Sequence, residues 1–293
     1  MTRIAIIGAG AIGGSVAAAL GNAGHDVELC VRSPFEELQV QFEEKAQTFS
    51  HRVLTEPTTV QPADWLLLCT KAHQTAGAAN WFSHAARKTT TVVVLQNGVE
   101  HESRVRGLIS KEANVLPCVV RLPATAIEPG HIVQNQAGRL QVPRTNAGSA
   151  FAKLFEGQKR IVVEPVDDFT SAAWDKLVRN AVSGLCAIAR QPMGILAQPA
   201  RRGFIVGLVA EIKAVGEAEG AVFSENLVDE FFAGYAGPIG QLWTSIAKDC
   251  RDGRSMEWDA RNAVVGRLGR KHEIATPLND TLTTMLELAD VGH

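Results

Sequence analysis

Lys176 and Asn180 combine side chains that can do chemistry with a spacing that places them together. They lie four residues apart in a segment whose apolar residues recur at steps of three and four, the period of a helix. Side chains at that spacing share one helix face. An ammonium group there can stabilise negative charge that develops on a substrate oxygen. The pair is therefore a candidate for chemistry, although a single lysine on a helix is usually a surface charge.

A second polar group lies nearer the C-terminus. It surrounds Gly253-Arg254, where one predicted helix ends and the next begins, and its members are Ser245, Asp249, Glu257 and Asp259. In isolation, these acids would be interpreted as helix caps and solvated charges.

The N-terminal stretch is typical of a dinucleotide site. An apolar run ends in the turn Gly8-x-Gly10-x-x-Gly13 and continues into a helical pattern. The first glycine permits the turn, the second lets the backbone approach a pyrophosphate, and the third lets helix and strand pack closely. Amides at the helix start, including those of Ala11 and Ile12, would meet the phosphate charge. A purely structural glycine turn is the alternative, but the flanking strand and helix favour a dinucleotide.

Polar side chains also follow the predicted strands. Arg32 follows the second strand, residues 26–31, and its guanidinium suits a 2′-phosphate. Glu28 is the nearest acid but falls mid-strand, too early to reach a ribose. We therefore expect NADP rather than NAD, unless Arg32 is a solvated surface charge. Lys71 and Asn97 each follow a later strand at the edge that faces a ligand, although a loop lysine and a turn asparagine would look the same.

The composition is that of an ordinary globular protein. Of 293 residues, 46% are hydrophobic and 20% charged, with a formal net charge of −2. This balance calls for neither nucleic acid nor a membrane as partner, and no apolar run approaches the roughly 20 residues of a membrane span. Five scattered cysteines without C-x-x-C spacing are expected to be reduced, which favours the cytoplasm. The eight histidines lack metal-ligand spacing, so no metal is expected.

The periodicity of the chain changes near residue 165. Before it, apolar runs predict strands, at residues 64–69, 91–95, 115–120, 131–134, 139–142 and 160–163. A charged stretch at 34–48 is expected to be a helical crossover, and a helix is expected to begin near residue 70. After it, the pattern predicts helices, over 174–188, 201–219, 239–252, 259–272 and 278–290. The prediction is an α/β Rossmann-type N-terminal domain, residues 1–165, followed by an all-α C-terminal domain, residues 166–293.

Motifs spread over both halves give a more specific indication. The chain resembles the ketopantoate reductase (2-dehydropantoate 2-reductase) family across nearly its whole length. The shared motifs are Gly8-x-Gly10-x-x-Gly13, Arg32, Thr70-Lys71-x-x-Gln74, Leu95-Gln96-Asn97-Gly98, Lys176-x-x-x-Asn180, Ser245-x-x-x-Asp249 and Glu257-x-Asp259-x-x-Asn262. The resemblance implies NADPH-dependent reduction of the ketone of a 2-oxo acid, with 2-dehydropantoate giving pantoate on the way to pantothenate and coenzyme A.

The resemblance also implies a role for each matched residue. Lys176 would polarise the keto oxygen and act as general acid. Glu257 would orient the substrate hydroxyl and the nicotinamide ribose, and Asn97 would line both nicotinamide and substrate. The substrate would be gripped by Asn180 and Ser245, and NADP held by Arg32, Lys71 and Gln74.

Three positions depart from the family pattern. Gly184 replaces a second asparagine, Met256 a residue that is often threonine, and Ala263 a glycine. The reaction type is therefore better supported than the substrate, and a related bulky or branched 2-oxo acid stays open. So do a 3-hydroxyacid-type dehydrogenase and an NADP-sensing protein without catalysis, although the group around Glu257 favours the reductase. Apolar faces of the C-terminal helices could form either a core or a homodimer interface.

Overall fold

The computed structural model describes residues 2–235 and 237–290. Its contacts divide the chain into two compact units. The sheet unit comprises Met1–Gln96 and Glu100–Phe169, and the helical unit comprises Asn97–Val99 and Thr170–His293. The main division falls four residues after the change of pattern near residue 165, and Asn97–Val99 joins the helical unit although its neighbours in sequence do not.

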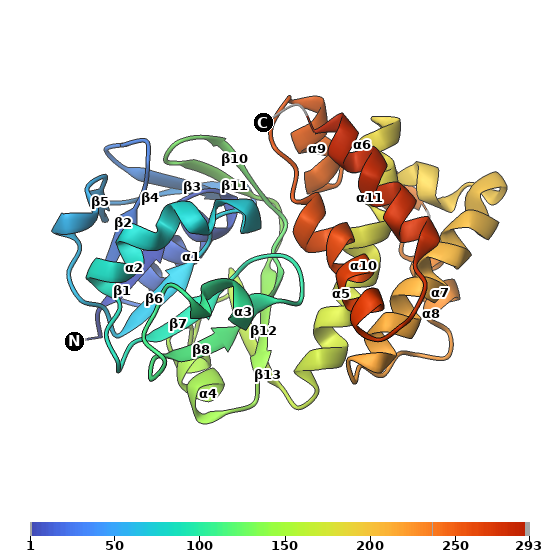
Figure 1. The fold of residues 1–293 in the computed structure, drawn as a ribbon. Helices are drawn as coiled ribbons and strands as arrows, with labels where there is room; N and C mark the ends of the chain where they lie inside the picture. The colour runs from blue at the N-terminus through green and yellow to red at the C-terminus, as the bar shows by residue number, and fades with distance from the viewer. Residues whose placement is uncertain (1, 236, 291–293) are drawn as a thin grey trace. The chain divides into compact units, whose positions relative to one another are not determined.

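The sheet unit is built on a six-stranded parallel sheet (Figure 1). Its strands, in spatial order, are β5 (Arg52–Leu54), β2 (Val27–Cys30), β1 (Ile4–Ile7), β6 (Trp65–Leu68), β7 (Thr91–Val94) and β8 (Asn114–Pro117). All neighbours pair in parallel. The order reverses between β1 and β6, and in open α/β sheets a ligand binds beyond the carboxyl ends of the strands at such a reversal.

A second sheet takes the place of the expected helix at residues 34–48. It has the order β10 (Ala124–Glu128), β11 (His131–Gln134), β3 (Leu38–Phe42) and β4 (Lys45–Phe49). The helical prediction was wrong because Leu38 and Val40 alternate with exposed or half-buried residues, a period of two, and Glu43 turns the chain with a φ of +56°. The charges that suggested a helix lie in the loop before β3, in the turn after it and at the start of the exposed strand β4.

Helix α1 (Ala11–Asn22) contacts both of these sheets. Its neighbours are β1 and β2 in the first sheet and β3, β10 and β11 in the second. All residues from 13 to 20 are buried, because the helix has no face turned to solvent. A Cβ at Gly14 would lie only 2.6 Å from Cγ1 of Ile132. The small residues of this helix therefore serve close packing between sheets.

The remaining elements of the sheet unit complete its core. A third sheet has the order β13 (Ile161–Val166), β12 (Gly138–Pro143) and β9 (Val119–Arg121), so the single strand expected at 115–120 is divided between β8 and β9. The helices are α2 (Ala79–Ala85), α3 (His101–Arg106) and α4 (Asn146–Lys153). The helix expected from residue 70 begins instead as two 3₁₀ turns, Ala72–Gln74 and Ala76–Ala78, ahead of α2.

The helical unit confirms the change to helices and differs in their bounds (Figure 1, yellow to red). Its elements are α5 (Phe169–Val182), α6 (Gly184–Ala189), α7 (Arg202–Ala218), α8 (Leu227–Ala233), α9 (Ser245–Arg251), a π-helical turn (Asp259–Ala263), α10 (Val264–Lys271) and α11 (Pro277–Ala289). The helix expected over 174–188 is broken at Ser183, and only a 3₁₀ turn, Gly237–Gln241, precedes α9 in the stretch expected to be helical from residue 239. Helix α8 was not expected.

All five cysteines are free thiols, as expected. Burial raises the pKa of the Cys30, Cys69 and Cys186 thiols above the ordinary value, so these groups stay protonated at neutral pH. Among the helices described, none is long and apolar enough to cross a membrane.

Candidate active site

Gly8 and Gly13 are required by the packing of the first turn itself. Gly8 follows β1 with a φ of +94°, and its N–H donates to the carbonyl of Cys30 at 2.9 Å. A Cβ at Gly8 would lie 2.9 Å from Cγ2 of Thr70, and one at Gly13 only 1.9 Å from the carbonyl oxygen of Gly8. A side chain at Gly13 would therefore force the helix away from the turn, and one at Gly8 would clash with the chain after β6 in a backbone conformation that favours glycine.

Gly10 has a different environment, which suits a ligand. A Cβ built there would meet no atom of the described chain within 4 Å. Gly10 caps α1 without a side-chain hydrogen bond, and the first turn of α1 carries no acidic residue. The amides of Ala11, Ile12 and Gly13 therefore lie at the positive end of the helix dipole, and no described atom lies within 4 Å of the position that a Cβ at Gly10 would take. These residues fit the pyrophosphate of a dinucleotide.

Glu28 within the neighbouring strand β2 and Arg32 beyond its end have different surroundings. Glu28 accepts hydrogen bonds from Nη1 of Arg52 at 2.5 Å and from the amide of Gln61 at 3.1 Å. Its carboxylate is thus held within the sheet unit, as its mid-strand position suggests. Arg32 is exposed and lies two residues beyond Cys30, which pairs with Ile7 just before the glycine turn. The cation Arg32 therefore follows the carboxyl end of β2, and the paired strand β1 ends at the glycine turn.

Gln96 organises the loop that carries Lys71 and Gln74, a role that its position in the sequence did not reveal. Its side chain is 3% exposed, and Nε2 donates to the carbonyl of Thr70 and to Oγ1 of Thr75, both at 3.0 Å. Gln74 accepts from the amide of Lys71 at 3.3 Å. The only sequence signal was a polar residue directly after a buried strand. Gln96 fixes the loop at the carboxyl end of β6, next to the glycine turn.

The helical unit brings Asn97, Lys176, Asn180 and Glu257 together. Asn97 Nδ2 donates to Oε2 of Glu257 at 2.9 Å. Asn97 Oδ1 accepts from Nζ of Lys176 at 3.1 Å and from Nδ2 of Asn180 at 3.2 Å. Lys176 and Asn180 lie on successive turns of α5, so they present both donors on one face. An ammonium, two amides and a carboxylate thus form one hydrogen-bonded group.

Arg261 extends this group to Ser245 and was not expected from the sequence. Its Nη2 donates to Oδ1 of Asn180 at 2.8 Å, and its Nη1 donates to Oγ of Ser245 at 3.3 Å. The residue is 4% exposed. Burial lowers the pKa of its guanidinium, while the nearby Glu257 and Asp249 carboxylates act in the opposite direction. The predicted substrate residues are thus linked through a buried cation.

Asp290 contacts both sequence neighbours of Glu257, the backbone of Met256 and the side chain of Trp258. Its carboxylate accepts from the amide of Met256 at 3.3 Å and from Nε1 of Trp258 at 2.9 Å. The π-helical turn that follows buries three successive residues, Ala260, Arg261 and Asn262. Such turns widen the helix by one residue and are frequent at functional sites.

Asp249, Asp259 and Gly184 lie in other surroundings. Asp259 is exposed and forms an ion pair with Arg267, while Asp249 is buried and paired with Arg254 at 3.2 Å. Gly184 starts α6 rather than continuing α5, and a Cβ there would lie 2.8 Å from Cδ1 of Leu286. A side chain at this position would therefore have to displace the end of the Leu286 side chain.

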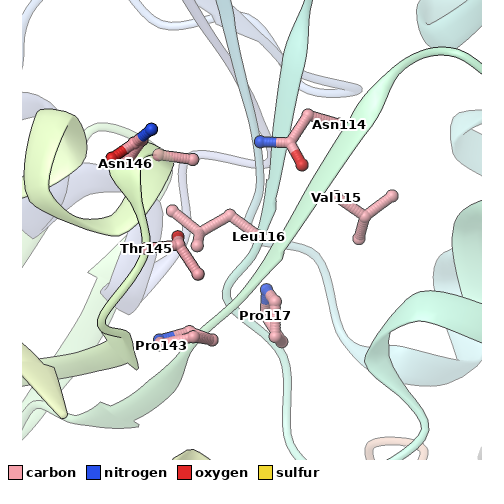
Figure 2. Close-up of a pocket in the computed structure, with 8 residues that line it drawn as sticks. Asn114, Val115, Leu116, Pro117, Pro143, Thr145 and Asn146 are labelled. Atoms are coloured by element: carbon pink, nitrogen blue, oxygen red, sulfur yellow. The ribbon is translucent and has the colours of Figure 1, made fainter. Parts of the chain in front are cut away.

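Figure 2 shows a pocket in the sheet unit. It has a volume of about 360 Å³ and is lined by residues such as Leu116 and Thr145, and none of the site residues predicted from the sequence lines it. Over residues 2–235 and 237–290, no group of three or more histidine, cysteine, aspartate or glutamate side chains could hold a metal ion.

Comparisons with known proteins show the family of the chain. Residues 4–147 match the family described as Ketopantoate reductase PanE/ApbA, and residues 168–290 match its C-terminal counterpart. The chain is 40% identical to 2-dehydropantoate 2-reductase of Caulobacter vibrioides and 34% identical to that of Mycobacterium tuberculosis, with 99% of each chain covered in both cases. The crystal structure of a PanE/ApbA family ketopantoate reductase from Ralstonia eutropha is similar with a TM-score of 0.90 at 28% identity, covering 99% of this chain and 98% of that chain.

The reversed sheet order, the glycine turn and these matches define a pyridine-nucleotide oxidoreductase. The chain belongs to the ketopantoate reductase family.

Proposed function

We propose that this chain reduces the ketone of 2-dehydropantoate with NADPH to give pantoate, a step toward pantothenate and coenzyme A. The observation that carries the proposal is the hydrogen-bonded group of Lys176, Asn97 and Glu257 in the helical unit. Family membership supports the same reaction, as do the activities for which the Caulobacter and Mycobacterium relatives are named. In this proposal residues 1–165 form the domain that binds NADP, and residues 166–293 form the domain that binds the substrate and carries the catalytic residues.

The roles of the residues follow from their chemistry. Bound NADPH supplies the hydride that reaches the keto carbon. Lys176 donates a hydrogen bond to the keto oxygen and passes it a proton as it becomes an alkoxide, since an ammonium stabilises that developing charge. Glu257 accepts a hydrogen bond from the substrate hydroxyl. Asn97 orients both Lys176 and Glu257 through its hydrogen bonds to them. Asn180 and Ser245 hold the rest of the substrate.

NADP is proposed over NAD on the basis of Arg32. Its position beyond the end of β2 suits a 2′-phosphate, while Glu28 is engaged by Arg52 and Gln61. Lys71 and Gln74, on the loop held by Gln96, complete the proposed cofactor contacts.

The assembly and location of the protein are also proposals. The exposed apolar side chains Met285 and Leu288 of α11 support a homodimer that covers this helix. The five free cysteines support a reducing compartment, the cytoplasm. Light scattering of the purified protein measures its mass and separates dimer from monomer.

A panel assay tests the proposed reaction. NADPH oxidation is followed with 2-dehydropantoate and other branched 2-oxo acids, and 3-hydroxyacids are assayed in reverse with NADP. We expect the highest kcat/KM with 2-dehydropantoate. Higher activity with another 2-oxo acid would change the substrate, activity only with 3-hydroxyacids would favour a 3-hydroxyacid-type dehydrogenase, and tight NADPH binding without turnover would favour a sensor.

A further inference from the structure

Arg261 is a buried cation that contacts two residues of the candidate site. It lies in the π-helical turn, four residues after Glu257, and is 4% exposed. Its Nη atoms reach Asn180 and Ser245, the two residues proposed to hold the substrate. Its Nε is buried and has no hydrogen-bond partner in the described part of the chain.

The guanidinium determines the direction of every hydrogen bond it makes. Arginine donates and never accepts, so Asn180 must turn its oxygen toward Arg261 and its NH₂ group away from it. Ser245 likewise accepts from Arg261, which leaves its own O–H to donate elsewhere. Arg261 therefore makes both substrate-holding residues into hydrogen-bond donors.

The charges around these donors favour an anion. Arg261 and Lys176 are two cations of the same hydrogen-bonded group, and Glu257 is the carboxylate that contacts it through Asn97. Asp249, the other nearby carboxylate, is paired with Arg254 at 3.2 Å. Two donors backed by an excess of positive charge are complementary to a carboxylate.

We infer that Arg261 is the positioning residue that selects substrates with a carboxylate, by holding Asn180 and Ser245 as donors to that group. This inference rests on the proposed reduction of a 2-oxo acid. Arg261 acts on the end of the substrate that does not change during the reaction. Its contribution is therefore made equally to bound substrate and transition state, and its loss raises KM more than it lowers kcat.

The test compares an acid with its neutral ester. The best-reduced 2-oxo acid of the panel and its methyl ester are assayed with wild type, Arg261→Met, Arg261→Lys and the control Arg270→Met. Arg270 is a solvent-exposed arginine on the following helix, α10. We expect Arg261→Met to lose about 30- to 100-fold in kcat/KM for the acid, mainly through KM, and less than about threefold for the ester. Arg261→Lys should restore part of the preference, and Arg270→Met should match wild type.

The outcomes separate this inference from the proposed function. Wild type that reduces no 2-oxo acid overturns both. Wild type that reduces the acid, with acid and ester falling equally in Arg261→Met, overturns only the role of Arg261. If Arg261→Met does not fold, Ser245→Ala must show the same acid-specific rise in KM, and an equal loss for the ester overturns the inference.

Discussion

Asn97 donates a hydrogen bond of 2.9 Å to Glu257, although 160 residues separate the two in sequence. The same amide accepts from Lys176 through its oxygen. An asparagine can serve both partners only in one orientation, with oxygen toward the ammonium and nitrogen toward the carboxylate. The acid and the carboxylate of the proposed reaction thus share one amide, whose oxygen accepts from Lys176 and whose nitrogen donates to Glu257.

Removal of the ammonium should slow catalysis strongly and leave cofactor binding intact. Lys176→Ala is expected to lower kcat about 10²- to 10⁴-fold, because the developing alkoxide loses its proton donor. NADPH affinity, measured by fluorescence titration, should change little. Lys213→Ala, on the exposed side of α7, is the matched control. Equal kcat in wild type and Lys176→Ala would refute the role of Lys176.

Arg32 should control the choice of cofactor. Arg32→Ala and Arg32→Asp are expected to weaken NADPH binding by at least about tenfold and to leave NADH binding nearly unchanged, because only NADPH carries the 2′-phosphate. Binding constants for both nucleotides measure the effect. Arg144→Ala, an exposed arginine elsewhere in the sheet unit, is the control. An unaltered preference would remove Arg32 from the phosphate site.

Gly10 and Gly13 should fail in different ways when changed to alanine. Gly13→Ala places a Cβ against the carbonyl of Gly8, so we expect a loss of several degrees in melting temperature or a failure to fold. Gly10→Ala meets no atom of the described chain, so it should fold normally and weaken NADPH binding. Calorimetry and nucleotide titration distinguish the two. Normal NADPH affinity in Gly10→Ala would argue against pyrophosphate contact there.

Asp290 should matter although it lies more than thirty residues after Glu257. Asp290→Ala leaves the indole N–H of Trp258 and the amide of Met256 without this acceptor. We expect a loss of about 1–3 kcal/mol in stability and a lower kcat, because Glu257 lies between the two released residues. Chemical denaturation and steady-state assays measure both effects. Unchanged kcat in a destabilised variant would restrict Asp290 to a structural role.

Cys186 should make the protein less stable at alkaline pH. Burial raises the pKa of its thiol from 9.0 to about 12. Because the folded pKa is the higher one, the contribution of this group is complete below pH 9 and is lost as pH rises from 9 toward 12, by up to about 1.4 kcal/mol per pH unit. Melting temperatures from pH 8 to 11 should fall less steeply in Cys186→Ala. Parallel curves for the two proteins would contradict the shift.

Elements that depend on the local periodicity of apolar residues could be predicted from the sequence. Features that depend on packing between distant segments could not. The strand before Gly8 and the helix after it follow from apolar runs and glycine spacing, and Lys176 and Asn180 share a face because of helical geometry alone. Arg261 could not be found in this way, because a regular helix pattern does not show the π-helical turn that buries it beside Asn262. The signal for β3 was present as the alternation of Leu38 and Val40, but the surrounding charges outweighed it.

The division of the chain at Asn97–Val99 limits how the protein can be divided into fragments or exchanged domains. The backbone passes between the units three times, after Gln96, Val99 and Phe169. A fragment that starts at residue 170 would carry Lys176 and Glu257 without the amide that joins them. Swapping C-terminal halves between relatives at a single crossover near residue 165 would therefore pair the lysine proposed to be catalytic with the asparagine of another protein.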